Sequence, residues 1–485
     1  MKSLIMTIIQ LNREKIYRQC THESEFTEQE IENVRQYLIK RFAKTGPIRQ
    51  PCKRLHVRKD IKCMSKVEVQ KLIEMFKRLY ATGFMDYMTA FHLKSWPQVH
   101  KYGEGLPWHR WFINEMEKEM MRLDPSVTLP YWNYFTDYAE PHLSIIWDYF
   151  GRAGNAQNDY CVPDGPFAGQ IVKHPEPHCL RRQWIDDKFM QAWESPEWIS
   201  TVIERGFDKQ SVSMRLKSLM SYAQSDDGTR ISKEINAFNN KMNPHYSKMW
   251  SQLGLDVAYS AHFKGHLYAG GFNGDFSMPY ATNDPIFYLY HAMGADLVVL
   301  SWQLSEDLNL VPENYGLGLK YNSNLNKTVL TNLETDMLTD FTNTSIKETF
   351  QIGFGELCYI HDHFVRPINH LIKGVKPTVP EAIKRLKTSL PDKLFEKYFP
   401  KFALYPNEVT FFDYLFPDVD NCANVCKPMP IAKRFVDTPE GRRVWDLFKN
   451  ALNLDITHAI KTSEDNYLTF MQHLNESNYC SPYVV

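Results

Sequence analysis

Two histidines stand four residues apart, at His262 and His266. On a helix this spacing places both side chains on one face, where two imidazoles can reach the same metal ion. His291 follows within the next predicted helix, and an antiparallel neighbour could deliver it to the same ion. The spacing therefore predicts three imidazoles on one metal, with further coordination positions left open.

A second group consists of His92, His100 and His109. We expect His92 on a helix, His100 on the connection after it, and His109 in the first turn of the following helix. Three neutral imidazoles suit copper, zinc or iron, so the ligand type alone leaves the metal open.

Helices must position these side chains, and the apolar periodicity predicts them. Ser65-Lys-Val-Glu68 has the form of a capping box, and Asp284-Pro285 has the form of a helix start. Residues 130–185 are rich in Pro, Gly and Asp, which is typical of a long irregular excursion. The expected helices span about residues 27–44, 65–80, 85–94, 109–123, 256–268, 284–304, 380–387 and 439–454.

Composition sets further bounds on this chain of 485 residues. It has 43% hydrophobic and 23% charged residues and a formal net charge of -1, typical of a soluble globular protein without a nucleic-acid partner. No stretch approaches the roughly 20 apolar residues of a membrane span. The one basic run is interrupted by apolar residues, which favours a solvated strand or loop face; it comprises Lys53, Arg54, Arg58, Lys59 and Lys62.

Nine cysteines favour disulfides over a zinc module, since Cys422 and Cys426 lack a second pair. Cys161 and Cys179 would suit a staple across the irregular excursion. Sequons at Asn326, Asn343 and Asn475 are typical of glycoproteins, and they favour secretion or a secretory vesicle, although no clear signal peptide precedes them.

The short sequence motifs around the histidines resemble the signatures of a known superfamily. Leu106-Pro-Trp-His109-Arg110 is similar to the first copper signature of the tyrosinase, catechol oxidase and molluscan haemocyanin superfamily, and Asp284-Pro-Ile-Phe-Tyr-Leu-Tyr-His291 to its second. His262-x-x-x-His266, followed by Gly270-Gly271, matches the pair that precedes the second signature. With shorter matches at 57–62, 129–132 and 164–167, the resemblance covers roughly residues 55–305 in the family's order.

The resemblance implies a mainly α fold, in which a four-helix bundle holds a dinuclear copper centre, with long loops. We expect an N-terminal helical segment over 1–54, a copper-binding domain over 55–310 and a mostly helical C-terminal extension over 311–485. Phe287 would pack near the two ions, and plain core filling explains it equally well; Phe263 would line the substrate pocket. By resemblance His92, His100 and His109 bind the first copper, and His262, His266 and His291 bind the second.

Four positions depart from the family's pattern. Gly105 stands where many members have Phe, and Gln98 replaces a cysteine that many eukaryotic members cross-link to the second histidine. The second signature's aspartate comes one residue late, at Asp296, which could disturb a bond near the metal or shift the helix register. Phe263 stands where members that hydroxylate monophenols often have Asn, and no Glu lies within ten residues upstream of His262.

The resemblance implies a tyrosinase-type or catechol oxidase-type oxidoreductase that converts o-diphenols to o-quinones with dioxygen. Because a phenol with pKa near 10 needs a base, the Phe263 departure favours diphenols over monophenols such as tyrosine. Melanin-type pigment precursors, other small catechols and protein tyrosines would all fit such a pocket. A haemocyanin-like reversible oxygen carrier and a copper-free structural relative are the alternatives.

Histidines outside the two groups are expected to be ordinary surface or hydrogen-bonding residues: His142, His178, His361 and His363. In this family C-terminal extensions often cover the active site. An aromatic residue of the extension could do so here, with ordinary packing as the simpler account; the candidates are Tyr359, Phe364, Tyr398, Phe399 and Phe402.

Overall fold

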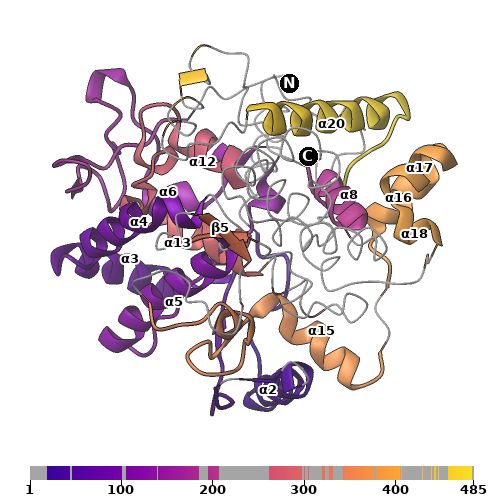
Figure 1. Ribbon diagram of the computed structural model, residues 1–485, viewed down its shortest axis with the longest axis horizontal. Helices are drawn as coiled ribbons and strands as arrows, with labels where there is room; N and C mark the ends of the chain where they lie inside the picture. Colours follow the sequence, from indigo (N-terminus) through magenta and orange to yellow (C-terminus); the bar gives the residue numbers. More distant parts are fainter. Residues whose placement is uncertain are drawn as a thin grey trace, which may run out of the picture.

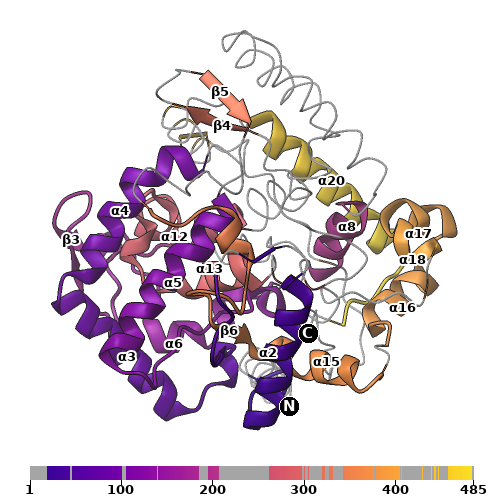
Figure 2. The ribbon, with the colours of Figure 1, turned by 60° about the horizontal axis from the view of Figure 1, so that its bottom comes forward.

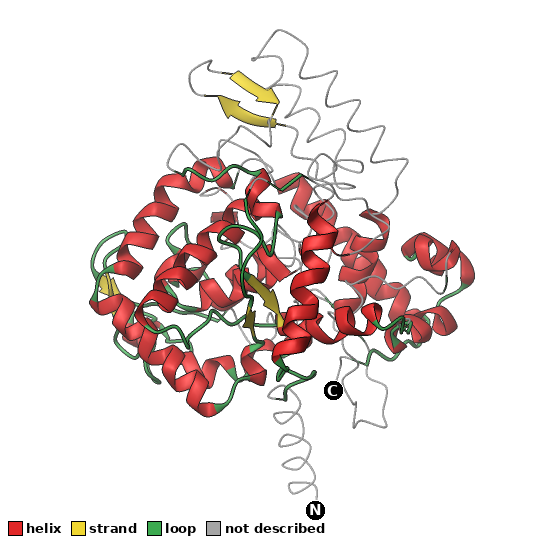
Figure 3. Ribbon diagram, turned by 90° about the horizontal axis from the view of Figure 1, so that it is seen from below, coloured by secondary structure: helices red, strands yellow, loops and turns green. Residues whose placement is uncertain are grey.

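The computed structural model is mainly α-helical, as the sequence predicts (Figure 3). It describes residues 19–43, 49–100, 105–138, 140–184, 195–206, 262–297, 342–375, 378–404 and 457–482, with a few further residues between them. No helix in these ranges is both long and apolar enough to cross a bilayer.

The helices form two groups (Figures 1 and 2). The first surrounds the histidines, and the second gathers α8, α16–α18 and α20 on the other side, with α15 lying against α2. The helix bounds are α2 Glu28–Ala43, α3 Lys66–Ala81, α4 Phe84–Val99, α5 Gly105–Leu123, α6 Ile146–Phe150, α8 Pro196–Gly206, α12 Phe263–Gly270, α13 Ile286–His291, α15 Asp362–Ile372, α16 Glu381–Ser389, α17 Asp392–Tyr398, α18 Pro400–Leu404 and α20 Thr457–Glu476.

Local sequence signals explain several of these bounds. Ser65 and Glu68 form the predicted capping box at the start of α3. The Asp284 carboxylate accepts a hydrogen bond from the Ile286 amide and so caps the start of α13. The helix expected to continue to residue 304 contains a π-helical turn after His291, Ala292–Leu297, and the described residues 300 and 304 beyond it are helical. Within the helix expected over 439–454, the described residues 439, 442, 443, 446 and 450 are helical. The first part of the helix expected over 256–268 lies outside the described residues.

Short strands link distant parts of the chain. Parallel strands β1 (His56–Arg58) and β6 (Tyr359–His361) pair with His56 opposite Tyr359. Hairpin β2–β3 (Ile171–Val172, His178–Cys179) lies within the predicted irregular excursion. A second hairpin pairs β4 with β5 (Leu319–Asn322, Lys327–Leu330). The β1–β6 pair joins the N-terminal and C-terminal thirds of the sequence.

Aromatic residues fill the interface of the second helical group. Trp198 of α8 packs against Tyr467 and Phe470 of α20, with ring centroids 5.8 and 5.6 Å apart. Tyr398 of α17 meets the same Phe470 at 4.7 Å. The aromatic residues considered as possible plugs are all buried: Tyr359, Phe364, Tyr398, Phe399 and Phe402.

Disulfide bonds cross-link distant parts of the chain. Cys161–Cys179 confirms the predicted staple, and Cys20–Cys63 fastens the segment before α2. Cys52–Cys358 joins residues 306 positions apart, directly beside the β1–β6 pair. Cys480 is also disulfide-bonded.

We predict that removing Cys52–Cys358 destabilises the protein more than removing Cys161–Cys179. The entropy that a cross-link removes from the unfolded chain grows with the logarithm of the closed loop, so loops of 306 and 18 residues differ by about 2.5 kcal/mol. Double alanine variants at each pair should be compared by chemical unfolding. Equal losses would contradict a cross-link that acts mainly by restricting the unfolded chain.

Candidate metal centre

The first three histidines meet where α4 and α5 pack together. His92 lies on α4, His100 follows its last turn, and His109 lies on α5. Their ring centroids are 4.9–5.7 Å apart. Gly105 permits the close approach of the two helices, because a Cβ there would stand 2.7 Å from the Val99 carbonyl oxygen.

Backbone carbonyls orient these rings. Nδ1 donates to Pro279 O in His92 (2.7 Å), to Trp96 O in His100 (3.1 Å) and to Gly105 O in His109 (2.6 Å). A carbonyl can only accept, so each Nδ1 carries the proton and each Nε2 keeps its lone pair. The three lone pairs are therefore available to one metal ion.

The second three histidines meet between α12 and α13. His262 precedes α12, His266 lies within it, and His291 ends α13, with centroids 4.6–5.1 Å apart. Nδ1 donates to Phe276 O in His266 (2.6 Å) and to Phe287 O in His291 (2.9 Å). His262 Nε2 stands 2.8 Å from His291 Nε2 and 3.2 Å from His266 Nε2.

The two groups face one another. His109 and His291 stack at 4.6 Å, and Phe287 lies on His291 at 3.8 Å and edge-on to His92 at 5.2 Å. Phe287 is 1% exposed, so it forms an internal wall shared by both groups. The side chain of Phe263 lies outside the described residues, as does that of Gln98.

Burial holds these imidazoles in the neutral form. Desolvation, and then the neighbouring His109, lower the pKa of His92 to about 3. Desolvation, and then the neighbouring histidines, also lower the pKa values of four further imidazoles well below the ordinary value: His100, His109, His266 and His291. Neutral imidazole is the form that binds metals.

The imidazole nitrogens of both groups are suited to binding metal ions. Nε2 of His92 and Nε2 of His109 are buried without a hydrogen-bond partner, which is costly unless another ligand uses the lone pair. In the second group, the acceptor nitrogens of His291 and His266 lie 2.8 and 3.2 Å from His262 Nε2, so a single cation could be the shared partner of all three. His100 and His262 are partly exposed, so the centre meets solvent on their side.

A third potential group, His22, Cys63 and Asp362, serves a different purpose. Cys63 is bonded to Cys20 and has no thiolate to offer. His22 Nε2 instead pairs with Asp362 at 3.0 Å. The group fastens the N-terminal segment to α15.

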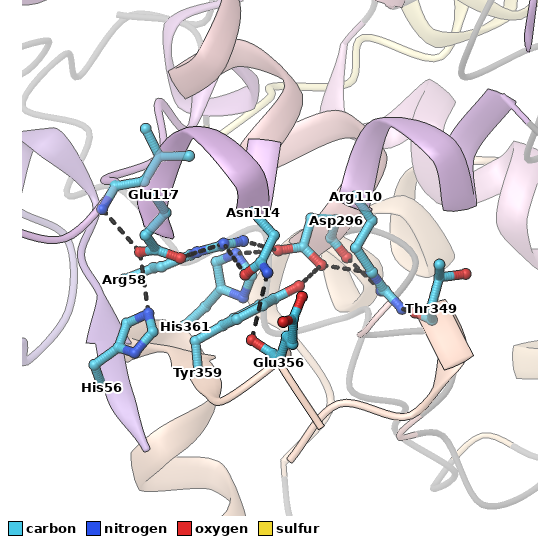
Figure 4. A network of polar contacts seen from close by, with 11 residues as sticks. His56, Arg58, Arg110, Asn114, Glu117, Asp296, Thr349, Glu356, Tyr359 and His361 are labelled. Carbon is cyan, nitrogen blue, oxygen red and sulfur yellow. Dashed lines mark hydrogen bonds and ion pairs between the residues drawn. The ribbon is translucent and has the colours of Figure 1, made fainter. Parts of the chain in front are cut away.

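A buried charge network supports both metal-binding helices (Figure 4). Asp296, on the π-helical turn after His291, accepts from Arg58 (2.5 Å), from Arg110 Nε (2.7 Å) and from the Tyr359 hydroxyl (2.8 Å). Arg110 directly follows His109, so this carboxylate ties the helix of His109 to the helix of His291. Arg58 also binds Glu117 and lies 3.5 Å from the centre of the Tyr359 ring.

Asp296, which comes one residue later than the aspartate of the family's second signature, lies in the π-helical turn. A π turn takes one residue more than an α turn, which lets the helix absorb an extra position. Asp296 therefore pairs with both buried arginines from within the π-helical turn.

The surface prediction for the basic run was wrong in part. Arg58 and Lys62 are 0% and 8% exposed, because Arg58 enters the network and Lys62 pairs with Asp137, whereas Lys53 and Arg54 are exposed. Of the two alternatives for His361 and His363, the surface position is wrong because both are buried, and His361 Nε2 lies 3.3 Å from Asp296. His178, by contrast, bonds Asp275 at 2.8 Å and is a hydrogen-bonding histidine as predicted.

Comparisons with known proteins agree with this geometry. Residues 82–305 match the common central domain of tyrosinase. Grixazone synthase of Streptomyces griseus is 24% identical over 262 residues, which cover 49% of this chain and 81% of that protein. The tyrosinase of Streptomyces antibioticus is 25% identical over 257 residues, which cover 51% and 82%.

Two further relatives are more distant or only partly covered. The putative tyrosinase-like protein tyr-3 of Caenorhabditis elegans is 26% identical over 51% of this chain, which spans 30% of that relative. A solved polyphenol oxidase variant from Thermothelomyces thermophila is 18% identical and covers 69% of this chain and 96% of its own, with a TM-score of 0.44.

The domain match and the sequence relatives define the class as an oxidoreductase of the tyrosinase type. Residues 82–305 thus carry the common central domain of the tyrosinase family of type 3 copper proteins. That family implies a dinuclear copper centre, and the two histidine groups are consistent with it.

We predict that Asp296→Asn lowers the free energy of unfolding by about 3–5 kcal/mol. The change leaves two buried guanidinium groups short of a counter-charge. Asp159→Asn is the matched control, since it removes the same charge from an exposed pair with Arg181 and should cost less than about 1 kcal/mol. Similar losses in urea unfolding would contradict the role of the network.

The network also predicts acid sensitivity. Burial would raise the pKa values of Glu117 and Asp296, but facing cations, Arg58 and Arg110 above all, hold both below the ordinary range. The unfolded chain therefore takes up protons first, and stability present above about pH 4 should fall as the pH drops below it. Glu117→Gln should flatten this slope, and the exposed Glu74→Gln should leave it unchanged. An unchanged slope in Glu117→Gln would contradict the assignment.

Proposed function

We propose that this chain is a dicopper phenol oxidase that oxidises o-diphenols to o-quinones. The observation that carries the proposal is the convergence of six imidazoles in two groups, with their Nε2 atoms turned inward. His92, His100 and His109 would hold one copper ion, and His262, His266 and His291 the other. Two copper ions bound there would supply the electron transfer to dioxygen.

The reaction balances without a further redox partner. Each o-diphenol gives up two electrons and two protons to become an o-quinone. One dioxygen molecule takes up four electrons and four protons from two diphenols and becomes two water molecules.

The protein's own groups prepare this chemistry. Backbone carbonyls keep five imidazoles in one tautomer and one orientation, so the ligands need little rearrangement when a metal binds. Phe287, buried against His291 and His92, would help to keep water from the space between the two groups. A planar phenol would approach from the side of His100 and His262, where Trp96 stacks on His100 at 5.1 Å.

The substrate class follows from position 263. Phe263 has no group that could accept a phenolic proton. Diphenols, which are more acidic and offer two oxygens, depend less on such a base than monophenols do. The disulfides support an oxidising compartment such as the secretory route.

Copper loading tests the ligand assignment. We predict two bound copper ions per chain, and about one after His109→Ala or His291→Ala, because each change removes a ligand from one group only. His473→Ala is the control, since His473 bonds Tyr398 in the second helical group and should leave the ratio at two. A ratio of two in both ligand variants would refute the assignment.

A substrate panel on the copper-loaded protein tests the chemistry. We predict that kcat/KM for 4-methylcatechol exceeds that for tyramine by at least about 10-fold, and that Phe263→Asn narrows this gap. Tyramine turnover as fast as catechol turnover, without a diphenol primer, would overturn the substrate class. Dioxygen uptake without quinone formation would instead indicate an oxygen carrier.

A further inference from the structure

The side chain of Tyr290 contacts His262 in two ways. The ring of His262 lies on Tyr290, with centroids 5.4 Å apart and planes 20° apart. The Tyr290 hydroxyl donates to the backbone carbonyl of His262 at 2.7 Å. One side chain therefore contacts both the ring and the main chain of this histidine.

His262 is also the most exposed histidine of its group, since His266 and His291 are buried and His262 is only partly so. A partly exposed ligand has fewer packing contacts that fix its ring, so a stacked neighbour can contribute more to its orientation.

Tyr290 contacts all of the second histidine group. It is 0% exposed, meets His266 edge-on at 5.1 Å and immediately precedes His291 on α13. The helix that supplies one ligand with residue 291 therefore contacts the other two with residue 290.

A second aromatic residue backs this tyrosine. Tyr134 packs on Tyr290 with centroids 4.5 Å apart. Gly294, in the π-helical turn, leaves room for it, because a Cβ there would stand 2.8 Å from the Tyr134 hydroxyl and 3.8 Å from His262 Cδ2. The turn after His291 thus makes the space in which Tyr134, Tyr290 and His262 pack.

We propose that Tyr290 is a positioning residue for the second metal ion, acting by holding His262 in its binding orientation. The inference rests on the proposed function, since it concerns copper binding at the same centre. Plain core filling would make Tyr290 a contributor to overall stability alone. A positioning role instead makes one of the two metal affinities depend on it.

The test compares copper affinities in three variants of the full chain. Tyr290→Phe keeps the ring and removes the hydroxyl, and Tyr290→Leu removes both contacts. Tyr288→Phe is the matched control: it removes a buried hydroxyl from the same helix, at 3.5 Å from the Thr282 carbonyl and away from His262. Titration with Cu(I) against a competing chelator gives the two affinities, and thermal melting of the metal-free proteins reports stability.

We expect the copper affinity of the group formed by His262, His266 and His291 to fall about 10-fold in Tyr290→Phe and about 100-fold in Tyr290→Leu. This is the range seen when a group that orients a ligand is lost. The other affinity and both affinities of Tyr288→Phe should stay within about 2-fold of wild type. Half-loaded Tyr290→Leu, once oxidised, should show the paramagnetic resonance signal of an isolated Cu(II) ion.

The outcomes separate the two claims. If wild-type protein binds fewer than two copper ions, the proposed function fails and this inference falls with it. If wild type binds two but Tyr290→Phe and Tyr290→Leu bind both with unchanged affinity, only the inference is overturned. Equal weakening of both ions, in proportion to a lower melting temperature, would also overturn it, because that pattern is one of general destabilisation.

Discussion

Bonds from imidazole Nδ1 to backbone carbonyls govern the arrangement of this protein. Each bond assigns the proton to Nδ1 and leaves a buried lone pair on Nε2. Buried lone pairs are costly, so a fold that gathers six imidazoles must either pair them or bind cations. The helices, the aromatic packing and the charge network hold these rings in place against that cost.

The charge network connects the two helices that carry His109 and His291. Asp296 binds Arg110, the residue after His109, and lies in the turn that follows His291. Its other partners come from β1 and β6, which lie about 300 residues apart in sequence but side by side in the fold. Residues 342–375 therefore belong structurally with the metal-binding helices.

Local patterns in the sequence predicted the parts of this structure that depend on neighbouring residues. The spacing of His262 and His266 is helical geometry, and the Cys161–Cys179 bridge closes a short loop, so both could be inferred. Arg58 was predicted at the surface and is buried. The local sequence of a cation beside apolar residues is the same whether its partner is water or a buried carboxylate 238 residues away. The π-helical turn and the contact of Tyr290 with His262 also depend on partners from other elements, which no periodicity reveals.

The central claim is that two groups of three Nε2 atoms each hold one copper ion. A crystal structure of the copper-loaded protein, with anomalous scattering recorded at the copper edge, tests this most directly. The account predicts two copper peaks, one within each group, with every imidazole bound through Nε2. A single peak, a peak elsewhere, or binding through Nδ1 would contradict it.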